Sequence, residues 1–300
     1  MNCEVFTHEN KIGDILVNEN LKKYNTYKVG GTASYIVFPK NVDKLIELIG
    51  FIKKYNIKYK VIGKGSNIVF SSKNFDGIII KLDKLNDCEV DDTVIEVGAG
   101  YSLSKLAISM TKKGLSGLEF ACGIPGTIGG AIFMNAGAYN SDMGYIVESV
   151  TVLNNNLEIK KLYNKELNFH YRSSFFQKNK DYVILSAKII LKNGDKKEML
   201  EIIEDRKKRR LMSQPLEFPS AGSVFRNTDI APSGKLIEDC GLKGYSIGGA
   251  MVSEKHANFI INSGDATGED IYNLIKKIKD EVLKKYNVTL LEEQEFVNME

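Results

Sequence analysis

The sequence predicts an α+β fold. Between residues 34 and 82, short apolar runs typical of strands alternate with a helical pattern, and between 147 and 191 three β-like runs follow one another. The last part of the chain, about 90 residues, combines helices and strands again and has the size of a small domain. Of the 300 residues, 43% are hydrophobic and 26% charged, as in a globular protein with ample material for a core.

The predicted strands are short runs rich in β-branched and aromatic residues, bounded by glycine, asparagine or charged residues. In chain order they are 34–38, 58–63, 68–70, 77–82, 93–100, 147–153, 157–163, 181–191, 257–262 and 288–293.

The predicted helices have apolar residues at helical spacing or suitable end signals. In the first of them, Leu45, Ile49 and Ile52 form one stripe, and in the second Ser102 is a candidate N-cap with Gly114 just past the end. We predict helices at 41–55, 102–114, 196–214, 233–241 and 268–287.

The amino-acid composition changes after the long charged helix predicted at 196–214. Pro215 and Pro219 lie close together, which marks a domain boundary near this point. The basic run at 206–210 could indicate nucleic-acid binding. Acidic residues just upstream and the preference of cations for a helix C-terminus favour an ordinary solvated helix end.

The overall charge and the rare residues exclude several classes of function. A net charge of +3 is weak for a nucleic-acid binder. The four cysteines are far apart and form no CxxC pair, which fits a reducing cytoplasm. The three histidines are also scattered, and there is no HExxH or GxSxG motif, so we expect neither a metal site nor a serine hydrolase of the usual type.

The uncharged stretch 120–141 is long enough to span a membrane. It contains five glycines together with Pro125, Asn135 and Asn140, whereas a membrane span is dominated by bulky apolar residues. The N-terminal region is polar and shows no signal peptide. We therefore expect no membrane segment.

Two glycine-rich segments could hold phosphate: GKGSN at 63–67 and CGIPGTIGGA at 122–131. Glycine lets backbone N–H groups approach an anion closely, and serine and asparagine can add hydrogen bonds. Neither segment has the GxGxxG or the GxxxxGK[ST] pattern. Each alone could be a tight turn, but together they favour an anionic cofactor with a large apolar portion.

A few other side chains could contribute chemistry. Ser223 follows Ala-Gly and precedes two apolar residues, where a serine is commonly a cap or turn former. Tyr171 and Arg172 stand beside an aromatic cluster, where an arginine could bind a carboxylate or pair with a surface acid. Glu292 and Glu293 end an apolar run, where an acid is more often a solvated strand end than a catalyst.

Six motifs in a fixed order say more than these residues singly. They are NTYKVGG, GKGSNIVF, GLEFACGIPGTIGGAIFMNAGAY, YRSSFF, PSAGSVFRN and KHANFIIN. With them the chain closely resembles the UDP-N-acetylenolpyruvoylglucosamine reductase (MurB) family of peptidoglycan synthesis, from about residue 25 to residue 293.

The resemblance implies a cytoplasmic flavoenzyme of cell-wall biogenesis, which serves cell shape and cell division. Family members hold FAD in a two-part domain of the vanillyl-alcohol oxidase type, and a C-terminal domain closes over the sugar nucleotide. NADPH reduces the flavin, which then passes hydride to the enolpyruvyl group of UDP-N-acetylglucosamine-enolpyruvate to give UDP-N-acetylmuramate. We expect a monomer without a nucleic-acid, membrane or metal partner.

Domain limits and cofactor contacts are carried over from the family by position. The expected parts are an FAD-binding subdomain at 1–77, a second one at 78–205 and a substrate-binding domain at 206–300. The residues expected to line the flavin nucleotide are Gly63, Lys64, Gly65, Ser66, Asn67, Ile68, Gly123, Pro125, Gly126, Thr127, Gly129, Gly130, Ala131 and Gly137.

The catalytic and substrate-binding residues come from the YR and GSxF(K/R)N motifs. The resemblance makes Ser223 the proton donor and Arg172 the residue that polarises the substrate carboxylate. Tyr171, Arg226 and Asn227 match positions that bind the sugar nucleotide. About fifty residues separate Arg172 from Ser223, which matches the shorter type of the family, without a substrate-covering insertion.

The catalytic glutamate is less well defined by the sequence. The family ends V-x-L-x-x-E followed by an apolar residue and later a glycine, but here Gln294 follows the second acid and no glycine comes after it. Alignment selects Glu293, and Glu292 and Glu295 stay open as alternatives.

Two other functions are compatible with parts of the sequence. Another FAD-dependent oxidoreductase of the same fold would share the first 200 residues but would not need PSAGSVFRN or the C-terminal part. A catalytically inactive binder of flavin or sugar nucleotide could dispense with Ser223 and Arg172, yet both are present.

Overall fold

The computed structural model describes residues 3–299, and the chain forms two compact units. The first unit contains residues up to Val17, then Tyr35–Lys64 and Gly77–Lys207. The second contains Asn18–Ser34, Gly65–Asp76 and the chain from Lys208 onward. Each unit has its own buried apolar cluster.

The helices and 3-10 turns are distributed along the whole chain. The α-helices are α1 (Cys3–Glu9), α2 (Val42–Lys54), α3 (Leu103–Lys112), α4 (Ile128–Phe133), α5 (Phe175–Lys178), α6 (Lys196–Ser213), α7 (Ser233–Asp239) and α8 (Gly268–Tyr286). The 3-10 turns are η1 (Leu21–Tyr24), η2 (Glu119–Ala121), η3 (Met143–Tyr145) and η4 (Asn164–Glu166).

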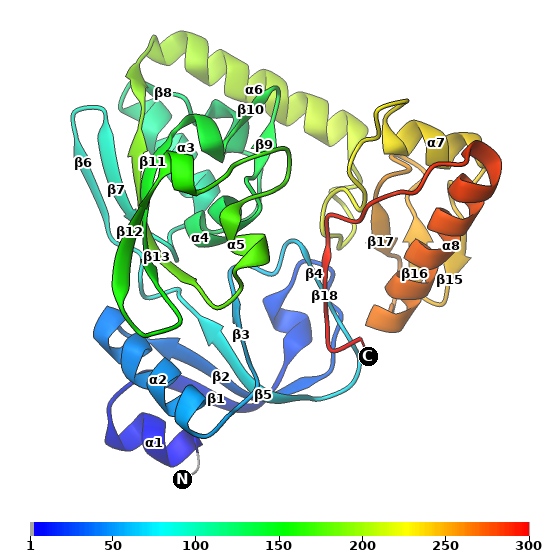
Figure 1. The fold of residues 1–300 in the computed structure, drawn as a ribbon. Coiled ribbons are helices and arrows are strands. Elements are labelled where there is room, and N and C mark those ends of the chain that lie inside the picture. The colour runs from blue at the N-terminus through cyan, green and yellow to red at the C-terminus, as the bar shows by residue number, and fades with distance from the viewer. Residues whose placement is uncertain (1–2, 300) are drawn as a thin grey trace. The chain divides into compact units, whose positions relative to one another are not determined.

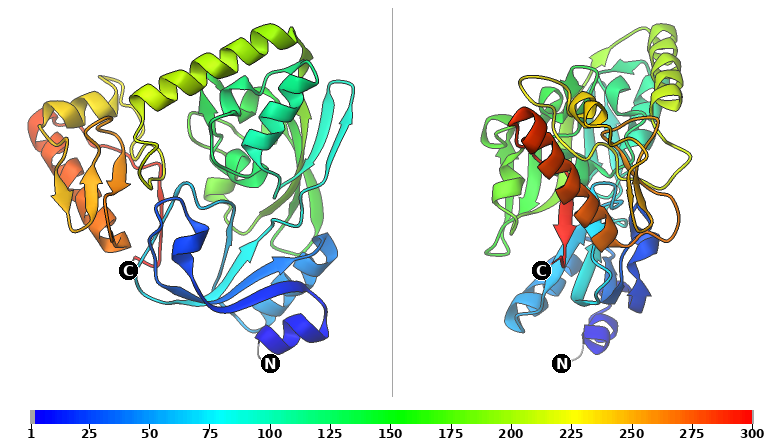
Figure 2. Two further views of the ribbon diagram at one scale, coloured as in Figure 1. Left: turned by 180° about the vertical axis from the view of Figure 1, so that it is seen from behind. Right: turned by 90° about the vertical axis from the view of Figure 1, so that its right-hand side faces the viewer.

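The first unit is built around a five-stranded antiparallel sheet of order β12-β11-β13-β7-β6. Figures 1 and 2 show α3 and α4 beside this sheet, and α4 packs against β13 and β7. The strands are β6 (Cys88–Asp91), β7 (Val94–Gly98), β11 (Val147–Leu153), β12 (Ile159–Tyr163) and β13 (Val183–Ile190).

A four-stranded sheet of order β1-β2-β5-β3 carries α2 (Figure 1). Leu45, Ile49 and Ile52 of α2 are buried in the same cluster as Ile78 and Ile80 of β5, so the predicted apolar stripe faces this core. The strands are β1 (Gly13–Asn20), β2 (Thr32–Pro39), β3 (Tyr59–Ile62) and β5 (Phe75–Lys81), with β3 parallel to β5. Short two-stranded ladders complete the unit: β9 (Gly137–Ala138) with β10 (Ser141–Asp142), and β8 (Leu115–Ser116) with β14 (Lys192–Asn193).

The second unit combines a three-stranded antiparallel sheet with α7 and α8. Thr267 and Asp270 form a capping box at the start of α8, and Asn287 ends the helix in a left-handed conformation. The strands are β15 (Ser246–Ile247), β16 (Ala250–Val252) and β17 (Ile260–Asn262), with β18 (Glu295–Val297) parallel to β4 (Ile68–Phe70) in a separate ladder.

The predicted α+β class is confirmed, and most predicted elements are present within a few residues of their expected bounds. One local prediction was wrong. The run 288–293 is not a regular strand: Glu292 makes an isolated bridge to Phe225, and β18 begins only at Glu295. The glycine-rich stretch, for which no helix was predicted, contains α4. Within residues 3–299, no helix has the length and apolar character needed to cross a bilayer.

Candidate functional site

The two glycine-rich segments meet in the first unit. Gly63 follows β3, and a Cβ atom added there would lie 2.5 Å from Thr127 Oγ1 of the second segment. Only a residue without a side chain permits this approach. The Gly63 carbonyl accepts a hydrogen bond of 2.6 Å from Lys81 Nζ, which fixes the loop from the other side.

Lys64 brings a positive charge to the same place. Its side chain is exposed, and Nζ donates to Ser102 Oγ at 3.0 Å. Ser102 stands at the N-cap position of α3, as predicted, but its hydroxyl makes no cap hydrogen bond. Ser102 also forms a β-bridge with Thr127. Lys64, Ser102 and Thr127 therefore converge on one place.

The second segment turns into α4 after Thr127. The hydroxyl of Thr127 caps the helix by accepting from Gly130 N at 3.3 Å, and Gly129 N donates to Ala99 O at 2.9 Å. The sequence argument expected such N–H groups to turn toward an anion, but these two already have partners in the protein. Gly129 instead permits close packing, since its Cβ would lie 3.1 Å from Ala99 Cβ.

Gly126 differs from both helical glycines. A Cβ atom built on it meets nothing within 4 Å, so the protein leaves space at this point. We call Gly63, Lys64, Ser102, Gly126 and Thr127 the glycine cradle. Close backbone approach, open space and one lysine form a donor set that fits the diphosphate of a dinucleotide such as FAD.

The other predicted cofactor residues of the first unit precede or follow Gly126 and Thr127 closely in the chain. Pro125 is exposed and Gly123 half-buried just before Gly126, while Ala131 is buried in α4. Gly137 opens β9 and is buried, and its carbonyl accepts from Arg172 Nη2 at 2.8 Å.

Arg172 is held in an unusual backbone conformation, with φ of 53°. Its guanidinium carbon lies 5.0 Å from the centre of the Tyr171 ring, and that ring is 51% exposed. Gln177 Nε2 donates to the Arg172 carbonyl at 3.0 Å. A non-glycine residue with positive φ needs support from its surroundings, and functional sites are common places for it.

The remaining residues of GKGSNI belong to the second unit. Gly65 has φ of 65°, and an added Cβ would clash with the Tyr24 carbonyl, so glycine is required. Asn67 Nδ2 donates to Glu293 O at 2.8 Å, and Asn67 O accepts from Glu295 N at 2.9 Å. Ser66 is half-buried, and Ile68 is the buried first residue of β4.

Ser223 and Glu293 lie on neighbouring extended segments of this unit. Ser223 forms a β-bridge with Phe259, and the next residue, Val224, accepts a hydrogen bond of 2.8 Å from Glu293 N. Asn258 supports the same segment by bonding Phe225 N and Phe225 O at 2.9 and 2.8 Å. The structure thus places the backbone segments of two of the three predicted catalytic residues side by side.

The three candidate glutamates differ in their surroundings. Glu292 pairs with Lys279 of α8, with its Oε1 2.6 Å from Nζ. Glu295 begins β18, where its backbone N–H donates to Asn67. Glu293 stands between them, joined through its backbone to Val224 and Asn67.

The two predicted substrate residues beside Ser223 have backbone or capping roles as well. Arg226 N donates to Leu291 O at 2.9 Å, and its side chain is half-buried. Asn227 is exposed, and its Oδ1 accepts from Ser233 N at 3.2 Å, at the start of α7.

Three supporting residues were missed by the sequence analysis. Lys81 looked like the polar end of an apolar run, yet its side chain is only 9% exposed and burial lowers its pKa. A lysine inside a hydrophobic strand was the available signal. Asn258 lay within KHANFIIN, and Ser102 was read only as a helix cap.

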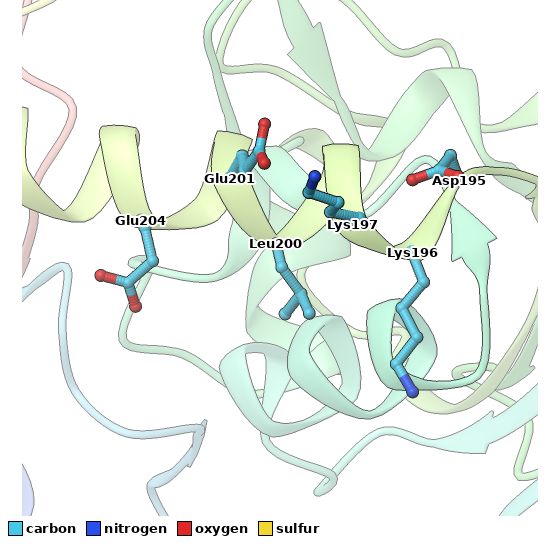
Figure 3. A pocket seen from close by; sticks show the side chains of 6 residues that line it. All are labelled: Asp195, Lys196, Lys197, Leu200, Glu201 and Glu204. Carbon is cyan, nitrogen blue, oxygen red and sulfur yellow. The ribbon is translucent and has the colours of Figure 1, made fainter.

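A surface pocket lies elsewhere in the first unit, against the first turns of α6 (Figure 3). None of the predicted site residues contributes to it. It is lined by Asp195, Lys196, Lys197, Leu200, Glu201 and Glu204. Among residues 3–299, no group of three histidine, cysteine or acidic side chains is arranged to hold a metal ion.

Comparison with known proteins identifies the family. Residues 33–163 match the family described as FAD binding domain, and residues 214–297 match the C-terminal domain of UDP-N-acetylenolpyruvoylglucosamine reductase. The chain is 44% identical over 287 residues to the UDP-N-acetylenolpyruvoylglucosamine reductase of Anoxybacillus flavithermus, covering 95% of both chains. The chain belongs to the UDP-N-acetylenolpyruvoylglucosamine reductase family.

Further relatives agree with this assignment. The reductase of Bacillus subtilis is 42% identical over 290 residues, covering 96% of both chains. The crystal structure of the MurB enzyme from Thermus caldophilus superposes with a TM-score of 0.79 at 30% identity, over 94% of this chain and 98% of that one. The resemblance is confirmed, and the chain is an FAD-dependent oxidoreductase of the MurB family with an FAD-binding domain followed by a MurB C-terminal domain.

Proposed function

We propose that the chain reduces the enolpyruvyl group of UDP-N-acetylglucosamine-enolpyruvate to UDP-N-acetylmuramate, with NADPH as reductant, in the cytoplasmic stage of peptidoglycan synthesis. The names of its relatives support the reaction. The observation that carries the proposal is the placement of Ser223 and Glu293 on adjacent, hydrogen-bonded segments. We also propose a monomer with FAD-binding parts at 1–77 and 78–205 and a substrate domain at 206–300.

The glycine cradle holds the flavin nucleotide in this proposal. FAD supplies the two-electron chemistry when bound, since it can accept hydride from NADPH and give it to a polarised double bond. Lys64 and the hydroxyls of Ser102 and Thr127 offer the diphosphate one cation and two hydrogen-bonding groups. The other residues of the predicted set line the nucleotide as proposed contacts.

Arg172 polarises the carboxylate of the substrate. Addition of hydride to the carbon beta to this carboxylate places negative charge on the alpha carbon and the carboxylate. A guanidinium there stabilises the transition state more than the ground state, because the charge develops during the reaction. The hydrogen bond to Gly137 O and the fixed backbone hold the side chain ready.

Ser223 gives its hydroxyl proton to that alpha carbon, which completes saturation of the double bond. A serine is a weak acid in water, but an enolate-like centre is a strong enough base to accept its proton at close range. The serine then recovers a proton from solvent or a neighbour. Hydrogen bonds on both sides of residues 223–226 keep this segment rigid.

Glu293 is the proposed third catalytic residue. Glu292 forms an ion pair with Lys279, whereas Glu293 is bonded through its backbone to Val224, next to Ser223, which supports Glu293 among the three candidates. The carboxyl group acts beside the developing charge, and Tyr171, Arg226 and Asn227 bind the sugar nucleotide.

A different FAD-dependent oxidoreductase is the alternative function. Such an enzyme would need neither a proton donor on the segment 223–226 nor an acid on the neighbouring segment. The adjacency of Ser223 and Glu293 therefore favours the reductase.

The test separates the two half-reactions in the Ser223→Ala variant. NADPH should bleach the flavin absorbance at the rate of the parent, whereas recovery of absorbance on adding the enolpyruvyl sugar nucleotide should slow by about 10²–10⁴-fold, the usual contribution of a positioned acid. Equal recovery in variant and parent would show that Ser223 is not the acid. A parent protein that oxidises NADPH without any response to this substrate would favour the alternative function.

A further inference from the structure

A polar contact lies inside the apolar core of the second unit. Tyr27 is fully buried and Gln294 is 5% exposed. The Tyr27 hydroxyl lies 3.1 Å from Gln294 Oε1, to which it donates. The other buried members of the cluster to which Tyr27 belongs are mostly aliphatic.

Gln294 also reaches the segment of the proposed proton donor. Its Nε2 donates to Ala221 O at 3.3 Å, two residues before Ser223. Gln294 directly follows Glu293, whose backbone bonds Val224. One amide side chain therefore ties the Glu293 segment to the Ser223 segment.

Tyr27 anchors this amide from a third direction. Its carbonyl accepts from Asn262 Nδ2 of β17 at 3.0 Å, and burial raises the pKa of its hydroxyl. The hydroxyl is thus a neutral donor throughout the working pH range. A buried tyrosine has little rotational freedom, so the position of Gln294 follows from that of Tyr27.

Stability alone does not require such a pair. Replacing both buried hydrogen-bonding partners with apolar groups of similar shape is often nearly neutral, whereas leaving one partner unsatisfied is costly. A satisfied polar contact in a core instead fixes one arrangement of the segments that carry it. Here those segments carry the two proposed catalytic residues of this unit.

We propose that Tyr27 and Gln294 are positioning residues that set the placement of Ser223 relative to Glu293 for the second half-reaction. The inference rests on the proposed function, because it assigns the pair a role only if Ser223 and Glu293 act on the substrate. Neither side chain is itself a catalytic residue.

The test is a double-mutant cycle with two readouts. Tyr27→Phe, Gln294→Leu and the double variant are compared with the parent in melting temperature and in both half-reactions. Tyr286→Phe is the matched control, since Tyr286 is another tyrosine that packs against the same cluster but is only partly buried.

Tyr27→Phe removes the partner of the Gln294 amide, and Gln294→Leu removes the partners of both the Tyr27 hydroxyl and the Ala221 carbonyl, so both should melt below the parent. The double variant should recover the part of the loss that belongs to the contact between the two side chains, but not the part that belongs to Ala221. Flavin recovery with substrate should slow by about tenfold or more in all three variants, because small displacements of reacting groups are costly. Reduction by NADPH should stay at the parent rate. The control should match the parent in both half-reactions.

Recovery of stability without recovery of the second half-reaction supports a positioning role. The inference is overturned if the double variant regains both together, if no variant slows the second half-reaction, or if both half-reactions slow equally. A parent protein that shows no flavin recovery with substrate refutes the proposed function, and the inference with it. If the parent shows flavin recovery with substrate, the proposed function stands, and the variants then test the inference alone.

Discussion

Gly126 offers a test of the glycine cradle, because the protein leaves the space beside it open. A Cβ atom at this position meets nothing within 4 Å, and Gly126 is not among the glycines with positive φ. Gly126→Val should therefore change the free energy of unfolding of the flavin-free protein by no more than about 0.5 kcal/mol. If the flavin nucleotide occupies that space, the same side chain must crowd it.

The size of the effect on binding follows from the cost of crowding a packed site. An overpacked contact costs about 1–3 kcal/mol. Since about 1.4 kcal/mol corresponds to a factor of ten, the dissociation constant of FAD should rise about 5- to 140-fold. Melting temperature without FAD, and titration of the flavin-free protein with FAD, measure the two quantities separately.

Valine substitutions at two other glycines serve as controls, one for FAD affinity and one for stability. Gly50→Val places the same side chain in α2, where the nearest atom is Leu157 Cδ1 at 3.5 Å, and FAD affinity should not change. Gly129→Val pushes against Ala99 and should lower the melting temperature. A folded Gly126→Val protein that binds FAD as the parent does would remove Gly126 from the cofactor site. One that melts as early as Gly129→Val would contradict the open-space argument.

Two further predictions concern charged groups. Lys64→Met should weaken FAD binding by about tenfold and make it less sensitive to salt, because a charge-assisted contact is lost. Titration with FAD at two salt concentrations checks this, with Lys84→Met, at an exposed lysine, as the control. Equal losses of affinity in both variants would argue against a local contact of Lys64 with FAD. Burial alone would raise the pKa of Glu269, but hydrogen bonds from Ser72 and Ser71 outweigh it and lower the pKa. The stability that Glu269 contributes is therefore present above its unfolded pKa of about 4.3 and is lost as pH falls through the lower folded value. Glu269→Gln should melt below the parent at pH 7, and the difference should shrink below about pH 4; a difference independent of pH would refute this account.

The fold was predictable where one segment alone contains the signal. The stripe of Leu45, Ile49 and Ile52 is sufficient to define α2, and the capping residues around α8 mark its ends. The run 288–293 has strand-like composition, but strand formation depends on a partner, and the partner strand β4 pairs with Glu295–Val297 instead. Pairing between distant segments is not visible in local composition.

The site was predictable from motif order but not from geometry. Motif order predicts that Ser223 and Glu293 act in the same reaction, which stays a prediction, and the structure adds that their segments are neighbours. The position of Lys81 inside a hydrophobic run was a weak signal, and its contact with Gly63 becomes known only from the structure. The contact of Tyr27 with Gln294 joins residues far apart in the chain and has no local signature.

The pairing of β4 with β18 also bears on how the chain is made. All segments of the first unit lie before residue 208, so the ribosome has delivered that unit while the C-terminal part is still being synthesised. β4 leaves the ribosome early, yet its parallel partner is made more than two hundred positions later. At the usual synthesis rates this delay is roughly 10–50 s. For that time an apolar strand edge stays open to chaperones or to other nascent chains, and a chain that stops before residue 295 would leave this edge unpaired.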